Sequence, residues 1–492
     1  MAFRSQPRPT GWPLPAATHM TGVVFVGLGA VMLLLGVIDA LYRENATGFL
    51  VGGLTGIALG TVLRRLGNGH TDPRRAEALF TVALLWILVP ALGAIPFWIS
   101  GNLAPLDALF ESVSGFTTTG STVLTDFSAW GYGLFLWRSL IQWFGGIGIL
   151  LIFIVVLPQL AVAGRQLFFA EVTGIQKEKI TSKLRQTAAM ILRIYGVLTL
   201  VCSAVYMATG QPPFEAICNA LSTVPAGGLS PNPASFADYS PVSQWFGTLF
   251  MFLAGIGFLL QYRLFFGREV QTLLRDSEFR AYTAIIGVSG MALAGYLFFS
   301  GTYSLEPSLR HAFFQVTSIV TTTGFASADF AQWALPAQMI LIALMFIGGT
   351  SGSAAGGIKV IRWLIAWALV KRELQRSLHP QAVLPLRVGN KVVGEDALRS
   401  VAAFVTLYIL LFAVGVGVIG ISENNFLYGF TASAAFIGNI GPAYGEFGPF
   451  GHYGELHPAS KIVAIIQMWA GRIELIPLMI LLFPTFWRRL RG

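Results

Sequence analysis

Charged residues are scarce in this sequence: Asp, Glu, Lys and Arg make up 11% of its 492 residues, whereas 54% are hydrophobic. A soluble domain carries about 25% charged residues, so the composition excludes an ordinary soluble protein. Mean hydropathy is +0.68. Apolar runs at 23–41, 78–99 and 134–157 each approach the roughly 20 residues that a helix needs to cross a lipid bilayer. The chain is therefore interpreted as an integral membrane protein.

Cysteine is also scarce, and metal-binding patterns are absent. The two cysteines, Cys202 and Cys218, both fall in apolar stretches, which predicts reduced packing residues rather than a disulfide framework. The six histidines show no ligand spacing, and no Ser–His–Asp or H-E-x-x-H arrangement occurs. We therefore expect no enzyme activity and no organic cofactor.

The net charge of +9 is distributed in a way that argues against a nucleic-acid partner. Basic residues gather in alternate short connections, and the intervening connections carry acidic residues instead. This positive-inside pattern predicts a multi-pass membrane protein with both termini in the cytoplasm. The basic residues are Arg64, Arg65, Arg74, Arg75, Arg165, Lys177, Lys179, Lys183, Arg185, Arg263, Arg268, Arg275, Arg280, Lys371, Arg372, Arg376, Arg488, Arg489 and Arg491.

Four repeats follow two initial spans at about 21–42 and 47–63. Each repeat has an apolar span, a short amphipathic stretch, a Thr/Gly-rich loop and a second span. The predicted fold is an all-α polytopic membrane protein with four pseudo-symmetric helix–pore loop–helix repeats around one central pore, plus an N-terminal two-helix unit. It would contain about ten transmembrane helices and four re-entrant half-helices. The predicted boundaries are 1–70 for the two-span unit and 71–187, 188–280, 281–396 and 397–492 for the repeats.

The four loops align without gaps. They read SGFTTTGST, STVPAGGLS, SIVTTTGFA and AFIGNIGPA, with shared glycines at Gly120, Gly228, Gly324 and Gly441. The second spans carry a matching break, where Gly146, Gly255, Gly349 and Arg472 are equivalent. The stretch before each loop has only about ten residues, too few to cross the bilayer. Irregular backbone at membrane depth is tolerated only inside protein or along a water-filled cavity, so four such loops predict a common central cavity.

The loop chemistry favours a dehydrated monovalent cation. Backbone carbonyls can replace the hydration shell of potassium, and glycine permits the backbone angles that turn successive carbonyls toward one axis. None of the loops places Asp or Glu beside its glycine, which argues against a divalent-cation filter. The alternative is that T-T-T-G is merely a helix C-cap.

The segments FESVSGFTTTGST, LWRSLIQWFGGIGI, FQVTSIVTTTGFAS, GGIKVIRW and GRIELIPLMILLFP resemble the TrkH/TrkG/KtrB superfamily of potassium transporters, and the two extra N-terminal spans make the chain TrkH/TrkG-like. The resemblance covers nearly the whole chain. It implies a potassium selectivity filter and, because all four glycines are present, a preference for potassium over sodium. The implied filter residues are Thr117, Thr118, Thr119, Gly120, Pro225, Ala226, Gly227, Gly228, Thr321, Thr322, Thr323, Gly324, Gly438, Asn439, Ile440 and Gly441.

Two loops depart from the T-T-T-G pattern. Pro225 stiffens the second loop and removes a backbone N–H, and the fourth loop has no threonine. The implied filter is therefore only pseudo-symmetric.

The third repeat contains IGGTSGSAAGGIK at 347–359. It is not a phosphate-binding loop, because Lys359 follows Ile358 and no Ser or Thr comes next. A run so rich in Gly, Ser and Ala predicts a flexible break in the span beneath the filter. The resemblance implies that this segment is an intramembrane gate, with Gly348, Gly349, Gly352, Gly356 and Gly357 as its glycines.

Arg472 lies in the middle of an apolar run, where arginine costs at least about 2.5 kcal/mol on insertion scales. Glu474 is two residues away and so lies on another face of a helix. We expect Arg472 to point into the pore, oppose resting cations and help position the gate; the alternative is a buried ion pair. Arg138 and Arg310 are expected to support the fold or to snorkel.

The expected function is potassium uptake through a gated, channel-like pore; the alternative is a proton- or sodium-coupled potassium symporter. The resemblance further implies a location in the bacterial cytoplasmic (inner) membrane, a homodimer and a cytosolic, nucleotide-binding TrkA-like regulatory ring. The basic loops are also expected to contact anionic lipid.

Overall fold

The computed structural model describes residues 14–67, 75–155, 180–265, 267, 270–382, 384–389, 391–473, 484 and 487. Helices dominate, which confirms the expected all-α fold, and the strands β1 (Arg387–Val388) and β2 (Lys391–Val392) form one antiparallel hairpin. The chain divides into two compact units, Met1–Leu103 with Ile476–Gly492 and Ala104–Leu475. Arg74, Arg165, Lys177, Lys179, Arg268, Arg488, Arg489, Arg491 and Glu474 lie outside the described residues.

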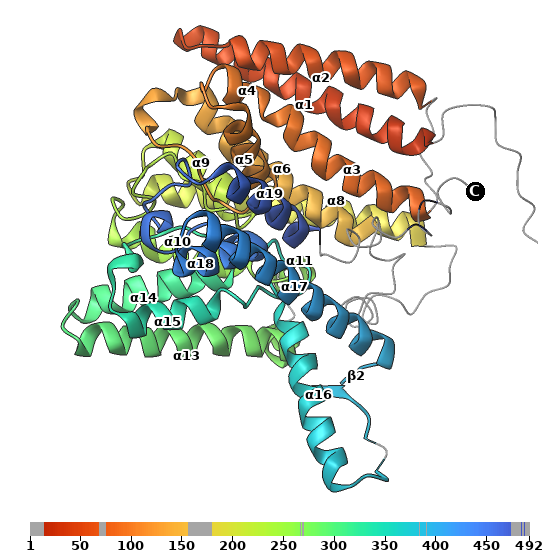
Figure 1. Cartoon of the computed structure of the whole chain (residues 1–492), viewed down its shortest axis with the longest axis vertical. Helices are drawn as coiled ribbons and strands as arrows, with labels where there is room; N and C mark the ends of the chain where they lie inside the picture. Colours follow the sequence, from red (N-terminus) through yellow and green to blue (C-terminus); the bar gives the residue numbers. More distant parts are fainter. Residues whose placement is uncertain are drawn as a thin grey trace, which may run out of the picture. The chain divides into compact units, whose positions relative to one another are not determined.

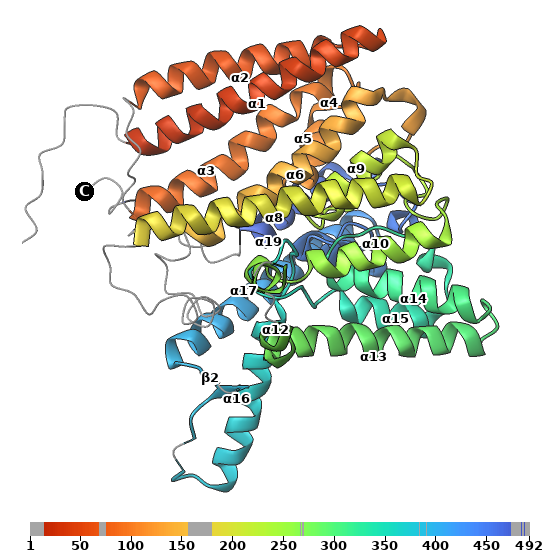
Figure 2. The ribbon, with the colours of Figure 1, turned by 180° about the vertical axis from the view of Figure 1, so that it is seen from behind.

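The first unit contains a pair of tightly packed helices. They are α1 (Pro15–Tyr42) and α2 (Thr47–Leu66), which run side by side in Figures 1 and 2, followed by α3 (Arg75–Gly93) and α4 (Ile95–Ile99). A side chain at Gly22 would strike the Gly60 carbonyl, and one at Gly29 would strike the Gly53 carbonyl. Small residues thus let the two backbones touch, as in other membrane helix pairs.

The second unit holds the four re-entrant helices and their flanking spans. Its described helices are α5 (Pro105–Phe116), α6 (Tyr132–Val155), α8 (Ile180–Ala208), α9 (Pro213–Thr223), α10 (Pro241–Ala254), α11 (Phe258–Phe265), α12 (Val270–Arg275), α13 (Ser277–Phe299), α14 (Leu305–Val320), α15 (Leu335–Leu344), α16 (Val360–Leu378), α17 (Glu395–Ser422), α18 (Phe426–Gly438) and α19 (Pro458–Arg472).

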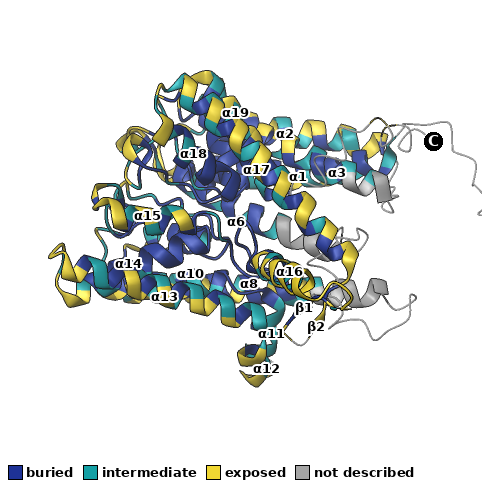
Figure 3. Ribbon diagram, turned by 60° about the horizontal axis from the view of Figure 1, so that its bottom comes forward, coloured by how far each residue is buried: buried dark blue, intermediate teal, exposed yellow. Residues whose placement is uncertain are grey.

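The re-entrant helices α5, α9, α14 and α18 pack against the spans that flank them. In repeats two to four each contacts the first span of its own repeat: α9 lies against α8, α14 against α13 and α18 against α17. Between repeats, α9 packs on α6, α14 on α10 and α5 on α19. The contact of α5 with α19 joins the first repeat to the last, so the repeats close into a ring. The buried side of α18 and the exposed outer helices are visible in Figure 3.

Among the described residues, six helices are long and apolar enough to cross a membrane. They are α1, α2, the segment Phe80–Ile99, α8, α13 and α17. The second spans are less regular. The pair α10 and α11 bends by 109°, α15 ends at Leu344 well before α16 begins, and α19 ends at Arg472, whereas α6 runs on through Gly146. The breaks predicted from sequence therefore occur in repeats two and three, whereas the residues that follow Ile473 in repeat four lie outside the described part of the chain.

Helix α16 and the β-hairpin extend away from the rest of the second unit (Figures 1 and 2). They are joined to the start of α17 by a small apolar cluster that includes Ile365, Leu386 and Val401. Arg372 at the far part of α16 pairs with Glu395 of α17 at 2.6 Å. This segment follows 347–359 directly, so any displacement of α16 is transmitted to that loop.

Candidate functional site

Each re-entrant helix ends in the same backbone turn. At the end of α5 the Thr118 N–H donates to the Gly115 carbonyl (2.9 Å) and the Thr119 N–H to the Ser114 carbonyl (2.9 Å). These two bonds form a Schellman cap. The same pair recurs after α9, α14 and α18, with Ser222, Ser318 and Ala435 in the place of Ser114. The helix-cap interpretation of T-T-T-G is therefore correct for the local backbone, but it does not account for the arrangement of the four loops.

Two residues in each loop have a positive φ. Thr118, Ala226, Thr322 and Asn439 have φ between 51° and 58°, and the shared glycines Gly120, Gly228, Gly324 and Gly441 have φ of 85°, 76°, 85° and 101°. Left-handed backbone is uncommon for a β-branched residue such as threonine. Its recurrence at four equivalent positions shows that the cap imposes it. Alternation of negative and positive φ turns successive carbonyls toward one side of the chain.

The shared glycines bring the four loops together in one register. A side chain at any of them would strike the carbonyl of the residue that precedes the glycine in the next loop. Gly120 faces the Gly227 carbonyl, Gly228 that of Thr323, Gly324 that of Ile440 and Gly441 that of Thr119. The last of these contacts closes the circle. The loops aligned by sequence thus form a ring of backbone, referred to below as the glycine ring, and only glycine fits at these four places.

The threonines of loops one and three bond within their own loops. The Thr117 hydroxyl donates to the Val113 carbonyl (2.7 Å) and lies 2.7 Å from the Thr119 hydroxyl. Thr321 repeats this geometry with Thr317 and Thr323, at 2.7 Å in both cases. All six loop threonines are fully buried. The hydroxyls of Thr117 and Thr119, and those of Thr321 and Thr323, stiffen the turn.

The second loop, which contains Pro225, receives support from outside. The amide of Gln142 on α6 donates to the Gly227 carbonyl at 2.6 Å and accepts from the Leu229 N–H at 3.3 Å. One side chain from the neighbouring repeat thus replaces the hydroxyl contacts that this loop lacks. Gln142 stands out in the sequence as a polar residue within the apolar run LIQWFGG, but it was not among the predicted site residues.

The fourth loop uses asparagine where the others use threonine or alanine. The Asn439 amide donates to the Thr119 hydroxyl (3.0 Å) and to the Met468 carbonyl (2.8 Å). It therefore ties loop four both to loop one and to α19. The fourth loop has no threonine, but this asparagine makes two contacts that the threonines do not make.

Replacing Asn439 with Gly should destabilise the fold by about 1–3 kcal/mol, because the two buried hydrogen bonds of its amide, to the Thr119 hydroxyl and the Met468 carbonyl, are lost. Glycine keeps the left-handed backbone, so the change removes only the side-chain bonds. Thermal unfolding in detergent would measure the effect. Asn424→Gly is the matched control, because Asn424 is also left-handed (φ 51°) but exposed. An equal loss in both variants would contradict this role for the amide.

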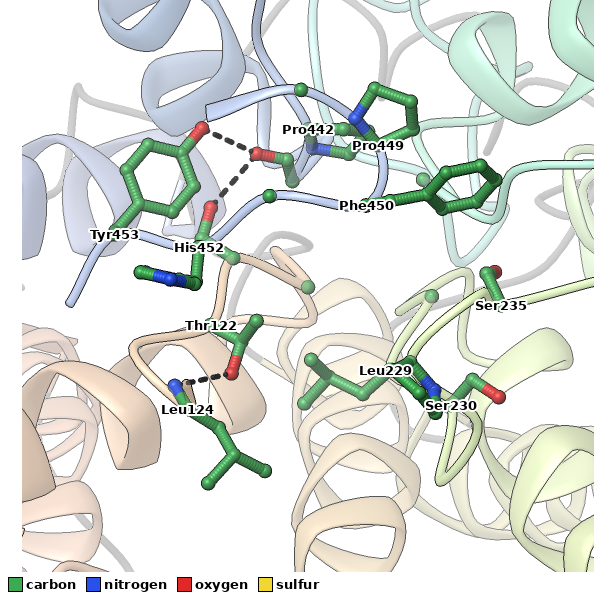
Figure 4. A pocket seen from close by; sticks show the side chains of 18 of the residues that line it. Thr122, Leu124, Leu229, Ser230, Ser235, Pro442, Pro449, Phe450, His452 and Tyr453 are labelled. Atoms are coloured by element: carbon green, nitrogen blue, oxygen red, sulfur yellow. Dashed lines mark hydrogen bonds between the residues drawn. The ribbon is translucent and has the colours of Figure 1, made fainter. Parts of the chain in front are cut away.

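The four glycines of the ring line a recess of about 120 Å³, which has room for several water molecules. Figure 4 shows Thr122 and Leu124 on one wall, Leu229 and Ser230 on another, and Tyr453 above them. The Tyr453 hydroxyl donates to the Gly441 carbonyl at 2.9 Å. No described residue that lines the recess is acidic, and Arg138 is its only lysine or arginine. A hydrated ion can therefore approach the ring through polar but largely uncharged surroundings.

Arg138 is fully committed to the fold, in line with the sequence expectation. Its Nε lies 2.6 Å from buried Glu111 of α5, and its Nη1 donates to the Ser230 carbonyl at 2.9 Å. The same Glu111 carboxylate accepts from the Val123 N–H at 2.9 Å. This buried pair braces the outer ends of loops one and two. Removing one partner would leave the other charge buried and alone, which is strongly destabilising.

Asp126 places a carboxylate beside the recess, next to Thr125 and Phe127, which line it. The pKa of Asp126 is lowered because the Ser128 hydroxyl and then the Ser128 N–H donate to its Oδ1 (2.6 and 2.8 Å). This exposed carboxylate is therefore charged at neutral pH and adds negative potential beside the recess.

Two further acids at the starts of re-entrant helices have specific partners. Asp107 of α5 pairs with Lys461 of α19, and Glu215 of α9 accepts from the Tyr239 hydroxyl at 2.6 Å. Arg310 of α14 pairs with Glu306 at 3.0 Å. These groups fasten helix ends in addition to complementing the helix dipole.

Residues 347–359 form no helix and lie against the glycine ring. The Gly356 N–H donates to the Thr322 hydroxyl at 2.6 Å, and a side chain at Gly356 would approach the Gly438 carbonyl. The Thr350 N–H reaches the Gly255 carbonyl (2.9 Å) at the break of the second repeat. Gly352 and Gly357 have φ of 73° and 65°. The segment therefore contacts loops three and four and one broken span.

Arg472 is 2% exposed and reaches residues 347–359. Its Nη1 donates to the Ala354 carbonyl at 2.8 Å, whereas its Nε and Nη2 have no hydrogen-bond partner. None of the described acidic residues pairs with Arg472. The charge is thus buried beneath the ring with one carbonyl as its acceptor.

Packing explains two of the three glycines that are equivalent to Arg472. A side chain at Gly146 would strike the Tyr195 hydroxyl, and one at Gly255 would strike the Tyr282 hydroxyl. These tyrosines donate to the Trp143 and Phe252 carbonyls, each at 3.0 Å. In repeats one and two, therefore, a tyrosine of the next repeat packs against the second span at this level. The sequence pattern identifies these glycines but not their tyrosine partners, which lie in the next repeat.

The ring of re-entrant loops within helical repeats defines a polytopic membrane protein of the pore-loop class. The family model for TrkH, described as a cation transport protein, matches residues 46–488. The chain belongs to this family, which comprises transport proteins and not enzymes.

Similar proteins cover almost the whole chain. TrkH of Salmonella typhimurium, named a Trk system potassium uptake protein, is 34% identical over 96% of this chain and 99% of its own length. TrkG of Escherichia coli, also named a potassium uptake protein, is 34% identical over 84% of this chain and 86% of its own. The crystal structure of the potassium transporter TrkH from Vibrio parahaemolyticus has a TM-score of 0.87 at 31% identity, covering 96% and 99% of the two chains.

Proposed function

We propose that this chain carries potassium ions into the cell through a gated, channel-like pore whose selectivity filter is the glycine ring. The observation that carries the proposal is the closed register in which each ring glycine faces a carbonyl of the next loop. A ring lined by backbone offers carbonyl dipoles without net charge, which suits a weakly hydrated monovalent ion that must also leave again. The relatives named potassium uptake proteins support the choice of ion.

The remaining parts of the proposal follow from position. Residues 347–359 are the gate, because they lie against the ring where an emerging ion must pass. The chain sits in the bacterial inner membrane with both termini cytoplasmic. The membrane potential then supplies about 2.3 kcal/mol per charge for each 100 mV, which is enough to drive uptake.

Two partners are part of the same proposal. A second copy of the chain would form a homodimer, and the exposed apolar side chains along α16, such as Trp367 and Leu374, offer a surface for it. A cytosolic TrkA-like ring that binds nucleotides would act on the gate through α16, which leads directly into it.

The purified chain in liposomes should pass current that reverses at the potassium equilibrium potential at every pH tested. A coupled symporter, the alternative function, would shift its reversal potential with the pH or sodium gradient, because the coupling ion moves with potassium. Reversal potentials recorded from these liposomes under bi-ionic gradients distinguish the channel from the symporter. A reversal potential that follows the proton or sodium gradient would refute the channel.

A further inference from the structure

One carboxylate fastens both ends of the segment 347–359. Glu278, in the first turn of α13, accepts from the Ser351 N–H (2.7 Å), the Ser351 hydroxyl (3.1 Å) and the Ile361 N–H (3.1 Å). All three donors meet the same oxygen, Oε1. Ser351 lies early in the segment, and Ile361 lies in the first turn of α16. A single group thus binds the entrance of the loop and the helix that follows its exit.

The bond to Ile361 satisfies a need of α16. The first N–H groups of a helix have no partner within it, and Lys359, the N-cap residue of α16, provides no side-chain cap. A carboxylate is the group that the positive end of the helix dipole favours. Glu278 therefore caps α16 from another helix, and this cap is lost whenever α16 moves away.

The helix that carries Glu278 is held in place by its contacts with other helices. The same helix α13 carries Tyr282, whose hydroxyl donates to the Phe252 carbonyl of α10 (3.0 Å), and it packs along α14. On its other side the loop meets the ring through Gly356 and meets Arg472 through Ala354. The loop is thus held on one side by Glu278 of α13 and on the other side by the glycine ring and Arg472.

We infer that Glu278 is a positioning residue that latches the gate in its blocking position, with its carboxylate holding Ser351 and Ile361 together. Opening requires these hydrogen bonds to break, so that α16 draws the loop away from the ring. This inference rests on the proposed function, since it assumes that the loop blocks the ion path.

The test compares four variants of the full chain in single-channel recordings. Glu278→Ala removes the latch, Glu278→Gln keeps its shape without charge, and Ser351→Ala removes one of three donors. Asp276→Asn is the matched control, because Asp276 lies in the same turn but accepts from Phe279 of its own helix at 2.8 Å.

We expect Glu278→Ala to raise the open probability by about tenfold or more, since it removes three hydrogen bonds, each of which shifts the equilibrium severalfold. Glu278→Gln should raise the open probability less than Glu278→Ala does, and Ser351→Ala less again. Asp276→Asn should leave it unchanged. Unitary conductance and the potassium-to-sodium permeability ratio should stay constant throughout, because the ring is untouched. An unchanged or lower open probability in Glu278→Ala would overturn the latch.

A second readout does not depend on current. Cys202 and Cys218 are buried, so Ser353→Cys, at a buried loop position, can report access of a thiol reagent. The thiol reagent should modify this cysteine faster when Ser353→Cys is combined with Glu278→Ala or Glu278→Gln. Modification should be slower in Ser353→Cys alone and in its combination with Asp276→Asn. Equal modification rates in all backgrounds would refute the latch, even if the ring proved not to conduct potassium. If the unaltered chain did not select potassium over sodium, only the proposed filter would be refuted.

Discussion

Replacing Gly324 with Ser is expected to lower the potassium-over-sodium permeability ratio by at least about tenfold. Gly324 has φ of 85°, and any Cβ there would strike the Ile440 carbonyl. A non-glycine residue in such backbone costs on the order of 1–3 kcal/mol. The strain is relieved most easily by turning the Ile440 carbonyl away, which removes a ligand from the proposed filter.

Bi-ionic reversal potentials would measure this change. Gly295→Ser is the matched control, because Gly295 lies in α13 of the same repeat with nothing within 4 Å of an added Cβ. The loss of selectivity should also differ among serine substitutions at the four ring glycines. At Gly441 the nearest atom would be 2.7 Å from the Cβ, farther than at the other three, so Gly441→Ser should be the mildest. If Gly324→Ser kept wild-type selectivity while folding normally, the glycine ring would not be the filter.

Much of this arrangement was visible in the sequence because it depends on local backbone. The gap-free alignment of the loops corresponds to one repeated set of bonds: residues such as Ser114 and Ser318 accept the N–H of the residue just before the glycine. Their spacing is fixed by the Schellman geometry, and so it survives when the side chains change, as at Ala435. The break at 347–359 was predicted for the same reason, since glycine content acts locally.

The side-chain partners could not be found in this way. Glu278 lies 73 residues before Ser351 along the chain, and Gln142 lies 85 residues before Gly227. No spacing rule connects residues of different repeats, because their proximity follows only from closure of the ring. Glu278 had a weak local signal as an acid in the first turn of a span, but that signal fits dipole complementation equally well.

The four repeats differ from one another at the positions beneath the glycine ring. In repeats one and two a tyrosine packs against the glycine beneath the ring, and these positions bear no charge. In repeat three the span opens into the loop, and in repeat four the equivalent residue is Arg472. The loop and the arginine then contact each other at Ala354. The two departures from symmetry thus form one structure, which supports a gating role for both.

Replacing Arg472 with Met should raise the basal potassium current by more than tenfold while leaving selectivity unchanged. A fixed charge repels an ion roughly 8 Å away by about 2 kcal/mol at an effective dielectric of ~20. The guanidinium is buried, with two nitrogens that lack partners, so solvent screens it little. Methionine fills similar volume without charge and also frees the Ala354 carbonyl. Flux of potassium or rubidium into liposomes measures the change.

Two companion variants separate the charge from the hydrogen bond. Arg472→Lys keeps the charge and should stay near the wild-type current. Arg472→Gln can still donate to the Ala354 carbonyl but is neutral, so it should behave like Arg472→Met if repulsion is the cause. A wild-type current in Arg472→Gln would instead assign the effect to loop positioning. If all three variants lost thermal stability together without any gain in current, Arg472 would be a structural group, and the charge beneath the ring would have no part in gating.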